Sequence, residues 1–357
     1  MTVEADRRVV NPTRPRRSVA RPALTLALLA LGLPVVAVVS IGFGQYPTPP
    51  LEVARVIIEQ VSGVPRGEAL DTVVWQLRIP RVLLGIFVGA ALATAGAALQ
   101  AVVRNDLADP YLLGVSSGAT LGAAAVIAGG AGTLIAVLGA TGGAFLGALL
   151  ALGLVLALLG GGRQLSGSRL VLAGLIVGYF LAAATNLLVA LSDDRDAVRS
   201  VLFWSLGSLS LASWGDLAAV VVLTTGAIVI FTVWGRRLDA VGLGDDVARS
   251  LGVDPFRLRM AVAVVAALSI AAAVAVSGAV GFVGLIVPHL ARRLVGAGHR
   301  RLIPAGALIG SLVLVIADAL ARTALAPREI PLGVLTALVG TPLLMLLMFR
   351  RRRRELP

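Results

Sequence analysis

Residues 82–103 read VLLGIFVGAALATAGAALQAVV, an apolar run in which no side chain is charged. A helix needs about 20 predominantly apolar residues to cross the hydrocarbon core of a bilayer. Lipid offers no hydrogen-bond partners, so a spanning segment must satisfy its own backbone, and a helix does this within one segment. Strands of a membrane barrel alternate in polarity, whereas this run is continuously apolar. We therefore predict a membrane-spanning helix here.

Runs of the same kind recur along the whole chain. They cover residues 23–43, 112–130, 133–160, 170–191, 217–234, 260–279, 282–290, 302–320 and 332–349. The first is too long for a signal peptide and lacks a clear cleavage site, so we expect it to be retained. The run at 282–290 is short and contains Pro288, which leaves either a full span or a re-entrant or broken helix. Counting it, the sequence predicts an all-α polytopic membrane protein with about ten transmembrane helices, whose many Gly and Ala residues allow close packing.

Composition excludes several classes of protein. Of the 357 residues 58% are hydrophobic and 14% are charged, all 31 basic residues are arginine, and there is no lysine or cysteine. Without lysine the chain has no Walker A loop, since that motif needs a lysine on the nucleotide phosphates. Without cysteine it has no disulfide, no thiolate catalysis and no cysteine-held metal. We therefore predict that the chain is not an enzyme and that it carries no metal and no cofactor of its own.

The arginines predict how the spans are oriented. With ten spans and a cytoplasmic N-terminus, 23 arginines fall on the cytoplasmic side and 8 on the outer side. This bias follows the positive-inside rule, and an odd number of spans would place the C-terminal arginines outside. We therefore predict a cytoplasmic arginine-rich N-terminus (1–22), a transmembrane domain (23–349) and a cytoplasmic basic tail (350–357). Because topology accounts for the net charge of +12, we expect a lipid membrane and no nucleic acid as a partner.

Two soluble stretches within the transmembrane domain contain predicted helices. The outer loop 44–81 includes an amphipathic run at 53–59, which predicts a surface helix. The cytoplasmic loop 235–256 includes a short helix that ends at glycine, formed by Leu243-Gly244-Asp245-Asp246-Val247-Ala248-Arg249-Ser250-Leu251-Gly252. Composition alone does not choose between a docking element and a structured connector for this helix.

Several motifs carry a more specific signal than composition. They are Arg78-Ile79-Pro80-Arg81, Gly89-Ala90-Ala91-Leu92-Ala93, Arg104-Asn105-Asp106-Leu107-Ala108-Asp109-Pro110, Leu113-Gly114-Val115-Ser116-Ser117-Gly118-Ala119, Gly278-Ala279-Val280-Gly281-Phe282-Val283-Gly284-Leu285-Ile286-Val287-Pro288-His289 and Glu329-Ile330-Pro331-Leu332-Gly333. In this order they closely resemble the FecCD family, the membrane permeases of ABC importers for iron–siderophores, haem and cobalamin. The resemblance covers nearly the whole chain apart from the arginine-rich N-terminus and the C-terminal tail.

The resemblance implies a type II ABC importer permease fold in a bacterial plasma membrane. A subunit of ten helices would pair with a second copy of itself or with a paralogous permease. Two ATPase subunits would bind on the cytoplasmic side and hold the ATP and Mg, while a substrate-binding lipoprotein would deliver cargo outside. The resemblance also implies that the segment 243–252 is the coupling helix that contacts the ATPase.

Three outer arginines match docking residues of the family. In its cobalamin importer, two arginines of the R-x-P-R motif and one near the outer end of the ninth span receive glutamates of the binding protein. The matching residues here are Arg78, Arg81 and Arg322. The alternative is that Arg78 and Arg81 mark a span boundary, while Arg322 pairs with Asp318 one turn away. We expect docking, together with an ion pair rather than a cation relay at Asp318.

The cytoplasmic gate of the family maps onto two loops. The resemblance places it at Asn105 and Leu107 after the second span, and at Gly167 and Ser168 between the fourth and fifth spans. The chain departs from the cobalamin importer by having Asp106 in place of proline and Gly167 in place of threonine, which puts the size of the gate in doubt. The alternative is that these are ordinary turn residues.

The cargo implied by the family is a ferric siderophore, haem or cobalamin, and we expect a ferric siderophore. An autonomous secondary transporter is the alternative of another class. Such transporters place several charged groups in the middle of the membrane, where this sequence offers only Asp318.

Overall fold

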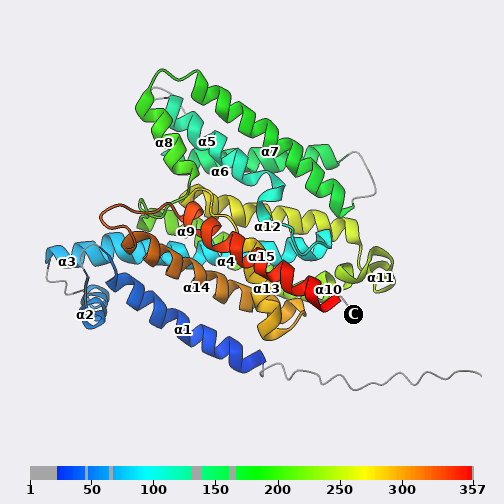
Figure 1. Cartoon of the computed structure of the whole chain (residues 1–357), viewed down its shortest axis with the longest axis horizontal. Helices are drawn as coiled ribbons and strands as arrows, with labels where there is room; N and C mark the ends of the chain where they lie inside the picture. The colour runs from blue at the N-terminus through cyan, green and yellow to red at the C-terminus, as the bar shows by residue number, and fades with distance from the viewer. Residues whose placement is uncertain (1–21, 45–46, 64–66, 130–138, 161–165, 356–357) are drawn as a thin grey trace, which may run out of the picture.

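The computed structural model of the chain describes residues 22–44, 47–63, 67–129, 139–160 and 166–355. These residues form helices and no strand (Figure 1). Seven helical segments are long and apolar enough to cross a membrane, namely α1 (Pro22–Gly42), the run Ala69–Val103 that ends in α4 (Ile79–Val103), α6 (Gly139–Leu159), α7 (Gly167–Ala190), α9 (Trp214–Val233), α12 (Pro255–Ser277) and α14 (His299–Thr323). The predicted N-terminus 1–22, except for Pro22, lies outside the described residues.

Three further helices match the remaining predicted spans. They are α5 (Val115–Gly129), α13 (Val283–Val295) and α15 (Leu332–Glu355). The 13 residues of α13 extend about 20 Å at 1.5 Å per residue, less than the ~30 Å hydrocarbon core, so this helix does not cross the core alone. Helix α15 continues to Glu355, beyond the predicted end of the last span at 349. The predicted fold class is confirmed, and the chain is a multi-pass membrane protein.

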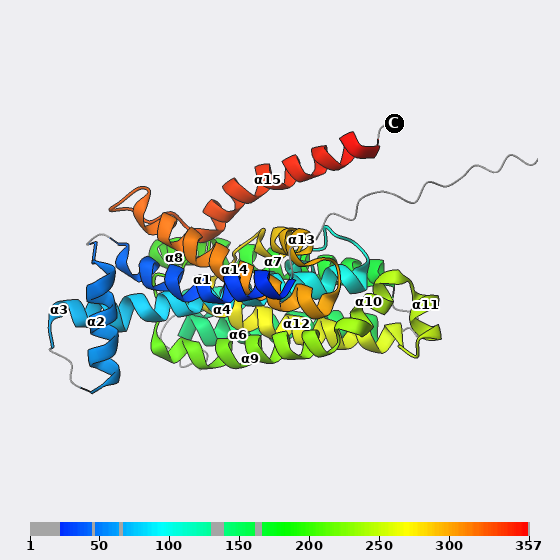
Figure 2. The ribbon, with the colours of Figure 1, turned by 90° about the horizontal axis from the view of Figure 1, so that it is seen from below.

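The short helices mark two opposite ends of the bundle. One end carries α2 (Pro50–Val61), α3 (Ala69–Thr72) and α8 (Arg195–Ser205), and the other carries α10 (Gly235–Leu243) and α11 (Asp245–Ser250) (Figures 1 and 2). The start of α1 and the end of α15 both point toward α10 and α11. We refer below to the end with α2 and α8 as the outer end and to the end with α10 and α11 as the inner end.

The predicted outer loop 44–81 ends earlier than expected. It contains the predicted surface helix as α2, but residues 69–81 are already helical, because α3 and the π-helical turn η1 (Val73–Arg78) run directly into α4. The prediction started the span at residue 82, where the uncharged run that follows Arg78 and Arg81 begins. Both side chains are instead buried among protein groups, and burial of this kind allows a charged residue to lie inside a spanning helix.

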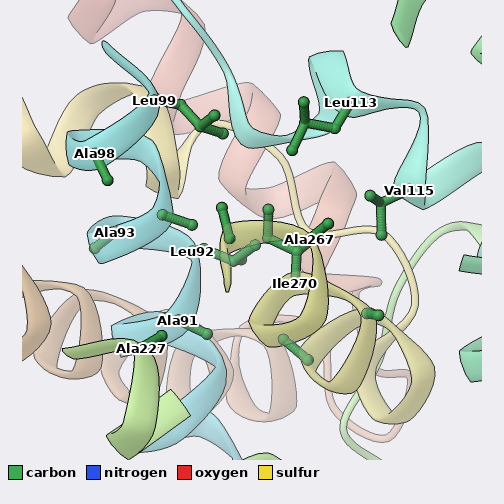
Figure 3. Packing of buried hydrophobic residues seen from close by; sticks show 14 of the residues in the cluster. Ala91, Leu92, Ala93, Ala98, Leu99, Leu113, Val115, Ala227, Ala267 and Ile270 are labelled. Carbon is green, nitrogen blue, oxygen red and sulfur yellow. The ribbon is translucent and has the colours of Figure 1, made fainter. Parts of the chain in front are cut away.

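Helix α4 lies at the centre of the bundle. It is the most buried of the long helices, and its neighbours include α9, α12, α13 and α14. Figure 3 shows Leu92 of α4 beside Ala267 and Ile270 of α12, with Ala227 of α9 close by. Alanine is the commonest side chain at this centre, and its small size lets neighbouring helix axes come close together.

Glycines bring α4 into backbone contact with two other helices. A Cβ at Gly89 would overlap the carbonyl oxygen of Gly310 on α14, and a Cβ at Gly96 would overlap the carbonyl oxygen of Gly284 on α13. No side chain other than hydrogen fits at such a crossing, so glycine is required at these positions by the packing of the helices.

We predict that Gly96→Ala destabilises the fold by about 1–3 kcal/mol, because the added methyl group must push α4 away from α13. The matched control is Gly226→Ala in α9, where no heavy atom lies within 4 Å of the added Cβ. There the same change should be neutral or stabilise by up to about 1 kcal/mol through helix propensity. Thermal unfolding of the detergent-solubilised variants measures both effects. Equal melting temperatures for the two variants would contradict the proposed backbone contact.

Candidate functional site

The outer end contains a buried ionic cluster centred on Arg81 of α4. Its Nε donates to Asp318 Oδ1 of α14 at 2.9 Å, and its Nη1 and Nη2 donate to the two carboxylate oxygens of Glu329 at 3.0 and 2.9 Å. Arg322, one turn after Asp318, places its Nε 3.0 Å from Asp318 Oδ2. Asp318 is therefore shared by two guanidinium groups, and the predicted ion pair with Arg322 is confirmed.

The arginines of this cluster also bind the end of α1. Arg322 donates to the carbonyl oxygens of Phe43 and Ser40 at 2.9 and 3.2 Å, and Arg78 donates to the carbonyl oxygen of Ile41 at 3.0 Å. The last carbonyl groups of a helix have no partner within the helix and carry partial negative charge. Guanidinium groups satisfy them here, and α1 is thereby fastened to α4 and α14.

The structure thus brings together the three predicted docking arginines, although Arg322 lies more than two hundred residues from Arg78 and Arg81 in the sequence. All three side chains are buried and bonded within the protein. Glu329 is the exposed member of the cluster, with 37% of its side chain accessible. A partner that approaches from outside therefore meets the Glu329 carboxylate over Arg81 before it meets a guanidinium group.

A cavity of about 560 Å³ opens beside this cluster at the outer end. It lies among α8, the start of α9, the end of α12 and the segment before α15. Its polar lining consists of Thr141, Ser200, Ser208, Ser210, Asp216, Ser277 and Glu329, and Phe203 and Trp204 are among the apolar residues that complete it. Glu329 is common to the cavity and the ionic cluster, so a ligand in the cavity would lie next to the partner of Arg81.

At the inner end, the predicted coupling segment 243–252 forms one short helix and the end of another. Helix α10 ends at Leu243, Gly244 separates the two helices with φ of 129°, and α11 follows. Gly252 ends the segment with φ of 76°, in a conformation that favours glycine. The side chains of Leu243, Val247 and Leu251 are exposed, so this end presents apolar residues on a protruding element.

Asp245, the first residue of α11, is held by a buried arginine of α12. Arg259 is 1% exposed, and its Nη1 and Nη2 donate to the two oxygens of Asp245 at 2.9 and 2.6 Å. Its Nε donates to the carbonyl oxygen of Val102 in the last turn of α4 at 2.9 Å. The hydrogen bonds from Arg259 lower the pKa of the Asp245 carboxyl, and Arg104 lowers it further. The pair therefore persists throughout the neutral range and is lost only when the pH falls through this lowered pKa.

Asp239 of α10 makes a second connection, to α14. Its Oδ1 accepts from the backbone N–H of His299 at 3.1 Å and lies 2.6 Å from His299 Nδ1. Burial alone would raise the pKa of Asp239, but the hydrogen bonds from His299 outweigh burial and lower it. Through these two carboxylates α10 is bonded to α14, and α11 to α12 and α4, while α10 also packs against α4.

The two predicted gate segments lie side by side at the inner end. A Cβ at Gly167 would come within 2.7 Å of the backbone of Val103, the last residue of α4. Asn105 Oδ1 accepts from the backbone N–H of Leu107 at 2.9 Å, which forms a tight turn and leaves the Leu107 side chain exposed. Ser168 Oγ lies 2.9 Å from Ser166 Oγ at the start of α7. Tertiary packing therefore joins the loops that the resemblance singled out separately.

Three functional candidates were missed by sequence reasoning. Arg259 counted only as a cytoplasmic anchor, and Glu329 only as part of a motif. Asp239 was not singled out, and His299 was expected to be a loop residue with no visible partner, because the two lie 60 residues apart in predicted loops. One signal was available for Arg259, since Asp254 and Pro255 mark a helix start and so place this arginine inside the helix.

Comparisons with known proteins agree with the arrangement described above. A family model described as the FecCD transport family matches residues 32–350. The hemin transport system permease protein HmuU of Yersinia pestis is 40% identical over 285 residues, 79% of this chain and 85% of that protein. The cobalamin import system permease protein BtuC of Halobacterium salinarum is 39% identical over 346 residues, 95% of this chain and 90% of that protein.

A solved structure has the same fold. It is described as a metal-chelate type ABC transporter in an inward-facing conformation, and it matches with a TM-score of 0.79 and 33% sequence identity. The match covers 92% of this chain and 99% of that chain.

We predict that Asp318→Asn destabilises the protein by about 3–5 kcal/mol, because it leaves two buried guanidinium groups without their shared carboxylate. Glu329→Gln should cost about 1 kcal/mol or less, since Glu329 is partly exposed and Arg81 keeps Asp318. Thermal unfolding followed by tryptophan fluorescence ranks the two variants. A Glu329→Gln variant as unstable as Asp318→Asn would contradict this assignment of the central carboxylate.

Proposed function

The chain belongs to the FecCD transport family and is an ABC importer permease, and on that premise we propose that it forms the translocation pathway for a ferric siderophore complex. A substrate-binding lipoprotein would deliver this complex at the outer end. The pathway would open at the inner end, into the cytoplasm of a bacterial cell. The positive-inside distribution of the arginines supports this orientation, in which both chain termini are cytoplasmic.

The outer cavity is the observation that favours a siderophore complex over haem. Haem iron in proteins is held by His, Cys, Met or Tyr. Among the described residues that line the cavity there is none of these, while four serines and a threonine offer hydroxyl groups. Such a lining suits a cargo whose metal is already fully coordinated by its own chelator and whose surface carries hydrogen-bonding oxygens.

The inner end supports an ATPase as the energy source. The lack of lysine in the chain excludes a Walker A loop, so ATP and Mg would be held by two separate ATPase subunits. The protruding helices α10 and α11 present the exposed apolar side chains of Leu243, Val247 and Leu251, a surface that fits a cleft on such a subunit.

A second permease subunit would complete the pathway. Helix α7 exposes Tyr179 and Phe180, and α15 diverges from the bundle toward its C-terminal end and exposes Leu338 and Val339 (Figure 2). These apolar faces support an interface with a second copy of the chain or with a paralogous permease. The inner gate would then be formed by the loops of Asn105 and Leu107 and of Gly167 and Ser168, which protrude beside the end of α4.

For the outer end we propose that acidic residues of the binding protein dock at Arg78, Arg81 and Arg322. Because Glu329 occupies the Nη atoms of Arg81, a docking glutamate would replace Glu329 with the same bidentate geometry. The buried position of the cluster supports docking by exchange of carboxylates rather than by simple contact at the surface.

We predict ATP-dependent uptake of a ferric siderophore by proteoliposomes that contain this chain, its ATPase and its binding protein. Ferrichrome, ferric enterobactin, haem and cyanocobalamin serve as probes in parallel. Uptake of one of the two siderophores, abolished when the ATPase is omitted, is the expected result. Uptake of haem or cyanocobalamin alone would overturn the proposed cargo, and uptake without the ATPase would show an autonomous secondary transporter.

We predict that Glu329→Gln strengthens binding-protein association about threefold, because it weakens the internal competitor for Arg81. The gain should shrink at high salt. Glu68→Gln is the matched control, since it removes the same charge from another exposed outer carboxylate. Surface plasmon resonance with the immobilised binding protein measures both. Equal affinities for the unaltered chain and for Glu329→Gln would contradict docking at Arg81.

A further inference from the structure

We infer that Arg259 is the positioning residue that makes α11 move together with α4 and α12. The inference rests on the proposed function, in which α10 and α11 receive the movement of the ATPase. It adds to that function a specific residue through which the movement enters the bundle.

Helix α11 depends on its first residue for its position. It has six residues, which is too short for a helix to be stable by itself in water. Ala248 is the one side chain of α11 that is buried, so apolar packing supplies little of its attachment. The two hydrogen bonds between Asp245 and Arg259, at 2.9 and 2.6 Å, are therefore a strong polar contact between α11 and the bundle, and Arg104 lies 3.6 Å from the same carboxylate.

The geometry of arginine allows one side chain to join three helices. The guanidinium fork binds both oxygens of Asp245 through its Nη atoms and still has Nε free to donate to the Val102 carbonyl of α4. That carbonyl lies at the C-terminal end of α4, where the helix dipole favours a cation. Lysine would keep the charge but has no planar fork with which to make all three bonds at once.

Helices α10 and α11 can transmit movement to different parts of the bundle. Asp239 attaches α10 to the start of α14, whereas Asp245 attaches α11 to α12 and α4. Gly244 lies between them with φ of 129°, a backbone conformation that leaves no continuous helix to connect the two rigidly. A push on α11 therefore reaches α4 through Asp245, by way of Arg259 and of Arg104, whose Nη2 lies 3.6 Å from Asp245 Oδ1 at the end of α4. Helix α4 extends from there to the ionic cluster at the outer end.

The test compares three variants in the complete transporter with its ATPase and binding protein in liposomes. Asp245→Asn removes the charge from the pair, and Arg259→Lys removes the fork but keeps the charge. Asp246→Asn is the matched control, because Asp246 is the next residue on α11, its side chain is fully exposed, and it pairs with Arg249 on the same helix. ATP hydrolysis and uptake of the transported siderophore are measured on the same preparations.

We expect Asp245→Asn and Arg259→Lys to lower the amount of cargo taken up per ATP hydrolysed about tenfold, the size expected for loss of a buried charge-assisted hydrogen bond. Hydrolysis should continue, because the exposed face of α11 is unchanged, and Asp246→Asn should behave like the unaltered chain. A fourth variant that combines Asp245→Asn with Arg259→Lys should take up no less cargo per ATP than either single variant, since both changes break the same connection. An unchanged amount of cargo taken up per ATP hydrolysed would overturn the inference, whether or not both activities fall together.

A second measurement on the chain alone in lipid nanodiscs does not depend on the proposed function. The chain has no cysteine, so spin labels attach only at introduced ones. With labels at Arg249→Cys on α11 and Arg301→Cys on α14, Asp245→Asn should broaden the distance distribution. With labels at Arg237→Cys on α10 and Arg301→Cys, it should leave the distribution unchanged. An equally narrow distribution for α11 with and without Asp245→Asn would overturn the inference even if the unaltered transporter proves inactive.

Discussion

The structure depends on the burial of α4 in backbone contact with its neighbours. Gly96 against Gly284 and Gly89 against Gly310 place the axes of α13 and α14 close to α4, and alanines fill most of the remaining contacts. In lipid there is no hydrophobic gain from helix association, so close packing of this kind provides much of the attraction between spans. The helix that results is a rigid element between the two ends of the molecule.

Buried arginines lie at both ends of α4, Arg81 on α4 itself and Arg259 on α12, and both are charged groups removed from water. Burial of a guanidinium group is tolerated where carboxylates and free helix carbonyls satisfy its five N–H groups. At the outer end Arg81 has Asp318 and Glu329, and at the inner end Arg259 has Asp245 and the Val102 carbonyl. The two ionic networks differ in the groups that lie between them and the surface of the protein. An exposed glutamate and a cavity adjoin the outer one, and a protruding helix adjoins the inner one.

This arrangement suits a transporter driven by a separate ATPase. Glu329 is partly exposed, so under the proposed function an acidic partner could compete with it for Arg81. The short helices α10 and α11 present an exposed apolar surface at the other end. Between them α4 is closely packed, because its glycine contacts leave no room for a side chain between its backbone and those of α13 and α14. Movement at one end is then expressed as displacement of a packed unit rather than as local deformation.

The sequence by itself determined the helices and predicted their direction across the membrane. The free energy of transferring an apolar run into lipid is a sum over the residues of that run, and the arginine bias is a count over the loops. Both can be read from the sequence without knowing which helices touch. The motif resemblance also singled out 243–252, the two inner loops and the three outer arginines, whose roles stay predictions. It did not show that residues 69–81 are helical, or that the outer arginines are buried.

Only the tertiary structure decided which groups the buried arginines bind. Arg81 meets Asp318 across 237 residues, and Arg259 meets the Val102 carbonyl across 157. Which side chains meet depends on which helices cross. The crossings depend in turn on which glycine-containing helix faces, far apart in the sequence, pack against each other. From a single sequence, an arginine near the end of a membrane span is interpreted as a residue that anchors the helix at the membrane surface. It becomes a connection between helices only when packing removes it from water and places a carboxylate beside it.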